Sequence, residues 1–260
     1  MTQPSLLLTA PIGRTIIRLA APNMLAMVVT MATFMAEAWY VGQLGTEALA
    51  GLALGFPMLM LVMMLSAGSF GGTITGAVAR LLGADDREGA ELLSLNAVLM
   101  MLLLAGLCSA IFLLGGREIY SLLGGRGRVL EQALAYSNVL FAGCVSLWLT
   151  NALAAVVRAT GHMSVAAKCL LAGSLLQVIV AGGLVFGLGP LPSMGIAGAA
   201  AGIVFGNTIA AILLLNFLVN RCVELRLRIS GMRLKMASII KLFKLGLLAS
   251  VNPISTTGTV

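Results

Sequence analysis

Long apolar segments alternate with short polar ones along the chain. Six apolar segments have about 20 residues or more, the length at which a helix crosses a hydrocarbon core roughly 30 Å thick. A seventh begins near residue 238 and runs to Val260. Backbone groups find no water in that core, so the segments are expected to be helices. The six predicted spans cover residues 19–41, 50–76, 92–114, 133–157, 165–187 and 195–219.

The first span contains Glu37, an acidic side chain inside a predicted span. A carboxylate at a helix centre in hydrocarbon costs roughly 3 kcal/mol unless it is paired, protonated or hydrated, so Glu37 is a functional candidate. Asn23, Thr30 and Glu37 are spaced seven residues apart, and Thr33 lies four residues before Glu37. Helical periodicity puts these four side chains on one face, which we expect to line a bundle interior or an aqueous cavity.

An alternative places Glu37 near the outer interface, where its side chain reaches water. Trp39 and Tyr40 follow it directly and are typical of an interfacial aromatic belt. The sequence pattern leaves both locations open.

The composition indicates an integral membrane protein. The chain is 60% hydrophobic and 10% charged, with a mean hydropathy of +1.06, whereas soluble domains carry about 25% charged residues. The net charge of +7 does not predict nucleic-acid binding, because the basic residues lie in short loops between apolar spans. Membrane lipid is the expected surrounding partner.

The basic residues also predict an orientation. Arg117, Arg126 and Arg128 lie on one side of the predicted spans, and the other 13 of the 16 lysines and arginines lie on the side of the N-terminus. The positive-inside rule places that side in the cytoplasm of a multi-pass protein of the cell (inner) membrane. Residues 221–237 are then a basic cytoplasmic linker.

Glycines recur at every fourth position in the second and sixth spans. Such strips let a neighbouring backbone approach closely, so we interpret them as helix-packing surfaces, with a sliding surface as the alternative. The two strips are Gly68, Gly72 and Gly76, and Gly198, Gly202 and Gly206.

The sequence lacks the patterns of an enzyme. Its four cysteines form no CxxC pair, so neither a metal site nor a disulfide framework is predicted. His162 is the lone histidine, and no Ser-His-Asp or paired-carboxylate set can be assembled in one layer. We therefore expect no enzymatic activity and no cofactor.

A short internal repeat suggests a second copy of the first span. Ile16–Leu19 is echoed by Ile239–Leu242, which opens the seventh apolar segment. We therefore expect residues 1–220 to form a six-helix N-terminal lobe and residues 238–260 to begin a second, truncated lobe.

Four stretches in order resemble the multidrug and toxic compound extrusion (MATE) family of transporters. They are similar to the family's first helix and outer turn, to its loop after helix two, to its turn after helix four, and to its join of helices five and six. The stretches are Glu37–Ala50, Ala79–Ala90, Val157–His162, and Leu184–Gly187 continued by Gly195–Ala200.

The resemblance implies an all-α membrane fold of two six-helix lobes around a central cavity, of which this sequence supplies the N-terminal one. It implies an antiporter that exports small organic, often cationic, drugs or toxic compounds against inward flow of Na⁺ or H⁺. Glu37 occupies the position of the family's helix-one acid, one methylene longer than the commoner aspartate, and is a possible Na⁺ ligand. The C-terminal lobe is then a missing partner.

The sequence also departs from the family. Some branches have Asn and Asp four apart in helix five, where this chain has Gln177 and Ala181, and a helix-six threonine is replaced by Ile203. We expect Glu37 to act with Gln177, Thr33 and residues of the missing lobe. The identity of the coupling ion is left open.

Two other functions compete with export. A related lipid-linked glycan flippase would be expected to line its cavity with several cationic residues, and no lysine or arginine lies clearly inside a span. A non-transporting membrane scaffold would use the glycine strips to bind partner helices.

Overall fold

The computed structural model describes residues 12–188, 192–223, 225 and 236–250, and every regular element in this part is helical. The all-α class predicted from the sequence is confirmed. The elements are α2 (Ile12–Gly42), α3 (Thr46–Met63), the π-helix η1 (Met64–Phe70), α4 (Gly71–Gly83), α5 (Arg87–Leu122), α6 (Gly127–Ala142), α7 (Cys144–Ala159), α8 (Met163–Phe186), α9 (Ile196–Asn220) and α10 (Met236–Ala249).

Four helices of the described part are long and apolar enough to cross a membrane. They are Thr46–Gly83, which joins α3, η1 and α4, together with α5, α8 and α9, and the bent pair of α6 and α7 would make a fifth. The predicted first span, 19–41, lies within α2. The count of six spans therefore stays a prediction.

Two predicted spans contain irregularities that apolar periodicity does not reveal. The second span includes the π-helix η1, and the fourth, predicted as one helix over 133–157, is broken at Gly143, where α6 and α7 meet at 49°. The break brings α9 close: a Cβ at Gly143 would lie 2.3 Å from a methyl carbon of Val204. The missing side chain at Gly143 thus allows the approach of α9.

The helices also extend beyond their predicted spans. Helix α5, predicted over 92–114, begins at Arg87 and ends at Leu122. Its first turn is capped by Asp86, whose Oδ1 accepts the Gly89 amide at 2.8 Å. Hydropathy predicts only the part of a helix that crosses the hydrocarbon core, whereas the helical backbone continues into the polar residues at both ends.

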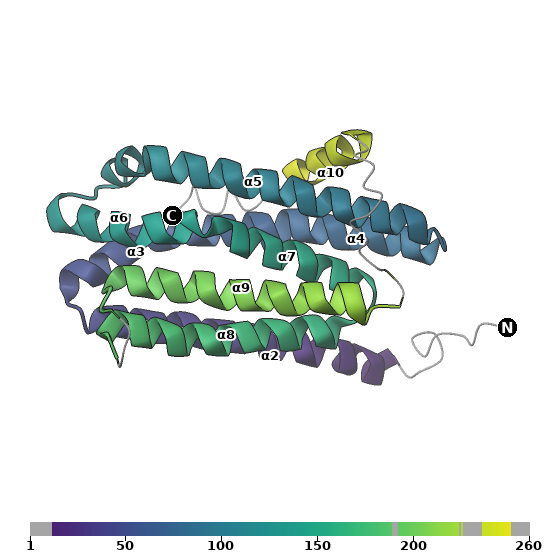
Figure 1. The fold of residues 1–260 in the computed structure, drawn as a ribbon, viewed down its shortest axis with the longest axis horizontal. Helices are drawn as coiled ribbons and strands as arrows, with labels where there is room; N and C mark the ends of the chain where they lie inside the picture. The colour runs from purple at the N-terminus through teal and green to yellow at the C-terminus, as the bar shows by residue number, and fades with distance from the viewer. Residues whose placement is uncertain (1–11, 189–191, 224, 226–235, 251–260) are drawn as a thin grey trace.

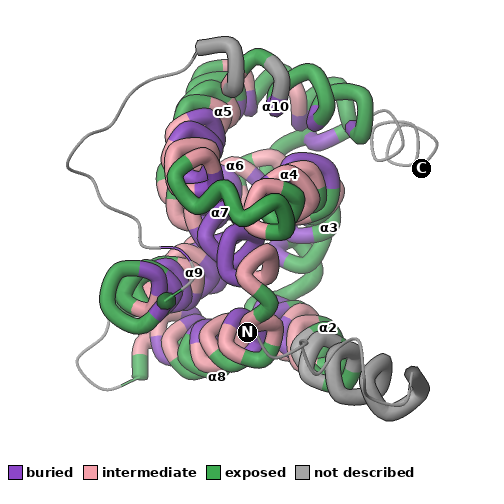
Figure 2. Tube along the Cα trace, turned by 90° about the vertical axis from the view of Figure 1, so that its right-hand side faces the viewer, coloured by how far each residue is buried: buried purple, intermediate pink, exposed green. Residues whose placement is uncertain are grey.

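The helices pack as two groups that run side by side (Figures 1 and 2). One group contains α2, α8 and α9, and the other contains α3 to α7, with α10 lying along α5 and η1. Helix α7 is central: every residue from Thr150 to Val157 is buried, so this part of the helix has no face toward the outside. This position places the Asn151 side chain inside the bundle.

The glycine strip on α9 lies directly against α8. A Cβ at Gly198 would approach the Leu184 carbonyl carbon to 2.7 Å, and one at Gly202 would approach the Ala181 Cβ to 2.5 Å. At Gly206 the nearest atom is the Gly173 carbonyl oxygen, at 2.6 Å. The two backbones therefore touch along the strip.

The strip Gly68, Gly72 and Gly76 has different surroundings. In the described residues, a Cβ at each of these glycines would meet no atom of another element within 4 Å. The close approach of α3 to a neighbour occurs instead at Gly51, where a Cβ would lie 2.6 Å from the Gln132 Cβ of α6. Gly51 lies outside the two glycine strips predicted from the sequence.

The predicted division into lobe, linker and second-lobe start stays a prediction. Residues 224 and 226–235 of the linker, and residues 251–260 of the second-lobe segment, lie outside the described residues.

Candidate functional site

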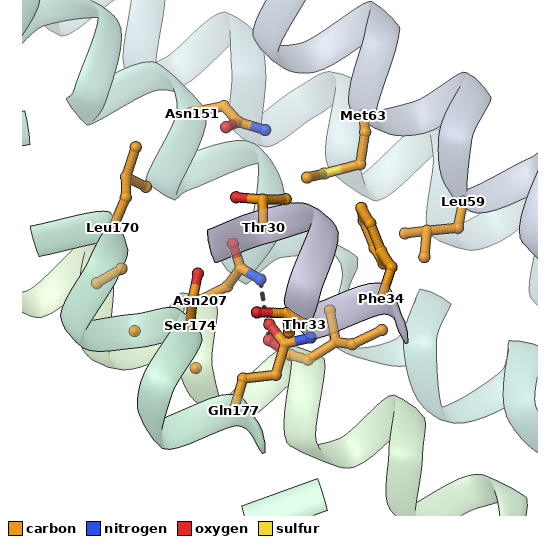
Figure 3. Close-up of a pocket in the computed structure, with 14 residues that line it drawn as sticks. Thr30, Thr33, Phe34, Leu59, Met63, Asn151, Leu170, Ser174, Gln177 and Asn207 are labelled. Atoms are coloured by element: carbon orange, nitrogen blue, oxygen red, sulfur yellow. Dashed lines mark hydrogen bonds between the residues drawn. The ribbon is translucent and has the colours of Figure 1, made fainter. Parts of the chain in front are cut away.

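Helices α2, α3, α7, α8 and α9 line a partly open cavity of about 130 Å³ (Figure 3). Its described lining contains no charged side chain and combines apolar groups such as Phe34 and Met63 with hydroxyls and amides. The polar lining residues are Thr30, Thr33, Asn151, Ser174, Gln177 and Asn207. We call this cavity the amide pocket.

Three of the five predicted coupling residues meet at the amide pocket. Thr30 and Thr33 reach it from α2, and Gln177 reaches it from α8. The Asn23 side chain lies outside the described residues. Glu37 lies one helical turn beyond Thr33 and is not part of the lining.

Glu37 is buried inside the protein, with only 5% of its surface exposed. Its Oε1 accepts a hydrogen bond from the Tyr136 hydroxyl at 2.8 Å, which joins α2 to α6. The Tyr136 ring is fully buried and packs on Gly55 of α3, where a Cβ would lie 3.0 Å from the ring. Because Gly55 has no side chain, the Tyr136 ring fits beside it, where its hydroxyl reaches the Glu37 carboxyl group.

The hydrogen bonds around the amide pocket use the nitrogens of its two asparagine amides. The Asn151 Nδ2 donates to the Ser66 Oγ at 2.8 Å, and the Asn207 Nδ2 donates to the Ile203 carbonyl at 2.9 Å. In the described residues neither amide oxygen accepts a hydrogen bond. Neutral oxygens inside an apolar cavity can replace part of the hydration shell of a small cation.

Four residues of this arrangement were not identified from the sequence: Tyr136, Asn151, Ser174 and Asn207. Each is a polar side chain inside a predicted apolar span, which is the signal that identified Glu37. In the first span the signal extends to Asn23, Thr30 and Thr33 because they share the face of Glu37, and Gln177 was predicted through the family resemblance. The other predicted spans contain no acidic residue from which to extend it.

The Tyr136 hydrogen bond leads to a stability prediction. We expect Tyr136→Phe to lower the thermal midpoint in detergent more than Tyr120→Phe does, because a bond to a carboxylate is about twice as strong as a neutral one. Tyr120 is a matched control, since its buried hydroxyl donates to the neutral Ser137 Oγ at 3.0 Å. Equal shifts in the two variants would contradict a stronger hydrogen bond at Glu37 than at Ser137.

Comparison with known proteins identifies the family of this chain. A family model described as MatE matches residues 22–182, more than half of the chain. The chain belongs to the MatE family. The family and the apolar helices together indicate a multi-pass membrane protein, and no catalytic family is indicated.

Three similar proteins show the extent of the match. The chain is 28% identical over 204 residues to the FAD transporter of Shewanella oneidensis, covering 78% of this chain and 45% of that protein. It is 24% identical over 230 residues to the multidrug export protein MepA of Staphylococcus saprophyticus, covering 87% and 49%. A MOP superfamily transporter structure from Pyrococcus furiosus is 26% identical with a TM-score of 0.83, covering 92% of this chain and 52% of that one. The chain thus spans about half the length of its relatives.

The structure shows the surroundings of Ala181 and Gln177, the positions in α8 where this chain departs from the family pattern. Ala181, at the position where some MATE proteins have an acid, is buried against Gly202 in the close α8–α9 contact. Gln177, one turn earlier, lines the amide pocket instead. In this chain, position 181 is therefore part of the helix packing and Gln177 supplies the polar group.

Proposed function

We propose that this chain forms the first lobe of a cation-coupled antiporter that exports organic, often cationic, compounds, with Na⁺ or H⁺ moving inward. The observation that carries the proposal is the buried Glu37 carboxyl group, one helical turn from a neutral amide pocket in a MatE protein. A buried acid in a membrane bundle is a functional group by default.

Within this proposal, Glu37 and the amide pocket have separate tasks. The Thr33, Asn151 and Asn207 oxygens bind a cation or the ammonium group of a substrate, while the apolar lining contacts its hydrocarbon part. Glu37 exchanges its Tyr136 hydrogen bond for a proton or a coupling ion in one conformation. Substrate and ion binding are then linked through α2, which carries both Thr33 and Glu37.

The size of the amide pocket supports a site shared between two lobes. Sites for drug-sized molecules are about 300–1,000 Å³, which is more than twice the volume of this cavity. We infer that the second lobe supplies the remainder of the substrate site.

A second candidate substrate is FAD, because one relative is named an FAD transporter. FAD carries two phosphates, which proteins recognise mainly through arginine and lysine. The described lining of the amide pocket contains no charged side chain, so this lobe favours an organic cation over a dinucleotide.

Transport by the complete polypeptide that contains this chain tests the proposal. In proteoliposomes, we expect a fluorescent organic cation to accumulate only when an Na⁺ or H⁺ gradient is imposed, and excess FAD to leave this accumulation unchanged. Accumulation of FAD without transport of organic cations would favour the second candidate. The absence of any transport would favour the scaffold function.

The orientation part of the proposal is tested by labelling two matched cysteines. Ser121→Cys lies at the exposed C-terminal end of α5, and Ser230→Cys lies in the predicted linker, outside the described residues. In a background without native cysteines, we expect a membrane-impermeant maleimide to label position 121 and to leave position 230 unlabelled in intact cells. The reverse pattern would invert the topology, because the basic linker would then be outside.

A further inference from the structure

The π-helix η1 lies between the amide pocket and α10. At its end, the Gly71 amide donates to the carbonyl of Ser66, five residues earlier, which is the hydrogen-bond pattern of a π-turn. Gly71 also allows the turn to close tightly, since a Cβ there would lie 3.0 Å from the same Ser66 oxygen. Short π-helical segments inside α-helices are frequent at functional sites.

One side of η1 is bonded to the amide pocket. Asn151, which lines the pocket, donates from Nδ2 to the Ser66 Oγ at 2.8 Å, and both side chains are buried. Met63, the residue before η1, lines the same pocket (Figure 3). The pocket therefore has a direct hydrogen bond into the π-turn.

The C-terminal end of η1 contacts α10. The Ser69 Oγ donates to the Ala249 carbonyl at 3.2 Å, and the Phe70 ring lies 6.2 Å from the Phe243 ring. Gly246 of α10 lies flat against Phe70, because a Cβ there would come within 2.3 Å of the ring. Ser69 is the third residue after Ser66, so the contacts to Asn151 and to α10 belong to the same turn of backbone.

We propose that η1 is a conformational relay that couples ligand binding in the amide pocket to the release of α10. A ligand bound by the Asn151 amide oxygen draws the amide toward the pocket and breaks the hydrogen bond that its nitrogen donates to Ser66. The turn then relaxes from π toward α spacing, and this register shift of one residue, a rotation of about 100°, turns Ser69 and Phe70 away from α10. The relay rests on the proposed function only in assuming that the pocket takes a ligand; the coupling itself is a property of the unliganded chain.

The coupling is tested by the reactivity of a thiol on α10. Leu242 is 2% exposed, so in a background with the four native cysteines replaced by alanine, Leu242→Cys reacts with N-ethylmaleimide only when α10 separates from the bundle. We expect Asn151→Ala to raise the labelling rate about fivefold or more, as expected for loss of one buried hydrogen bond. Asn207→Ala is the matched control, because its amide nitrogen bonds only within its own helix; its rate is expected to stay within about twofold.

A second variant identifies the Ser66 bond as the route. Ser66→Ala is expected to raise the labelling rate as much as Asn151→Ala, and the double variant is expected to add nothing further, since both changes remove one bond. Equal rates for Asn151→Ala and Asn207→Ala, or additive effects of Ser66→Ala and Asn151→Ala, would overturn the relay. The measurement needs no transport, so its outcome is independent of whether the protein is an exporter.

Discussion

Glu37→Gln is expected to reduce ion-driven export by the complete protein by about two orders of magnitude, a coupling effect within the usual range between two sites. Glutamine keeps the size of the side chain and can still accept the Tyr136 hydroxyl through its carbonyl oxygen, so insertion and folding are expected to be unchanged. The variant cannot take up a proton or carry the negative charge that attracts a coupling cation. The measurement is gradient-driven accumulation of an organic cation in proteoliposomes, at matched protein content.

Glu47→Gln is the matched control for this experiment. Glu47 is exposed at the start of α3 and pairs with Arg128 at 3.5 Å, an arrangement that contributes little to stability. We expect its transport to equal that of the unmodified protein. Full export by the Glu37→Gln variant would remove Glu37 from the coupling mechanism and return attention to the amide pocket.

The second large effect concerns the free energy of unfolding, which we expect to change in opposite directions when two glycines are replaced by alanine. Gly206→Ala would place a methyl group 2.6 Å from the Gly173 carbonyl and 2.7 Å from the Gln177 Cβ, so α8 and α9 must separate. We expect it to lower the free energy of unfolding by about 2 kcal/mol, the usual cost of overpacking. It should also distort the amide pocket, which Gly173, Gln177 and Gly206 line.

Gly76→Ala provides the contrast within the same protein. A Cβ at Gly76 meets no atom within 4 Å in the described residues. Gly76→Ala should therefore raise the free energy of unfolding by about 1 kcal/mol, because alanine has a higher helix propensity than glycine. Thermal midpoints of both variants in the same detergent provide the measurement. Stabilisation by both alanines would contradict the close α8–α9 packing.

The sequence predicts the helical segments well because apolar length is a direct requirement of the bilayer. It does not predict the break at Gly143 or the π-turn in the second span, because both depend on how neighbouring helices approach. The α9 glycine strip illustrates the same limit. Its spacing is visible in the sequence, but Gly173, which faces it on α8, becomes evident only when the helices are placed together.

The candidate site is predicted in part, for a similar reason. Thr30, Thr33 and Gln177 meet at one pocket, as the polar stripe and the family resemblance suggest. Helical periodicity, however, predicts only which side chains share one face of one helix. The residues that contact this face lie on other helices. Tyr136 on α6 therefore could not be assigned to Glu37 from spacing alone.

The burial of residues 150–157 of α7 on every side has a mechanical consequence. This part of α7 is hydrogen-bonded to α4 through the Thr75 hydroxyl and the Ala155 carbonyl at 3.1 Å, and to α9 through the Thr150 hydroxyl and the Asn207 carbonyl at 2.7 Å. Sliding of α7 would break both hydrogen bonds, so we expect α4, α7 and α9 to move together. We then expect any alternation between two sides of a membrane to bend the lobe outside these three helices, in α2 and α10.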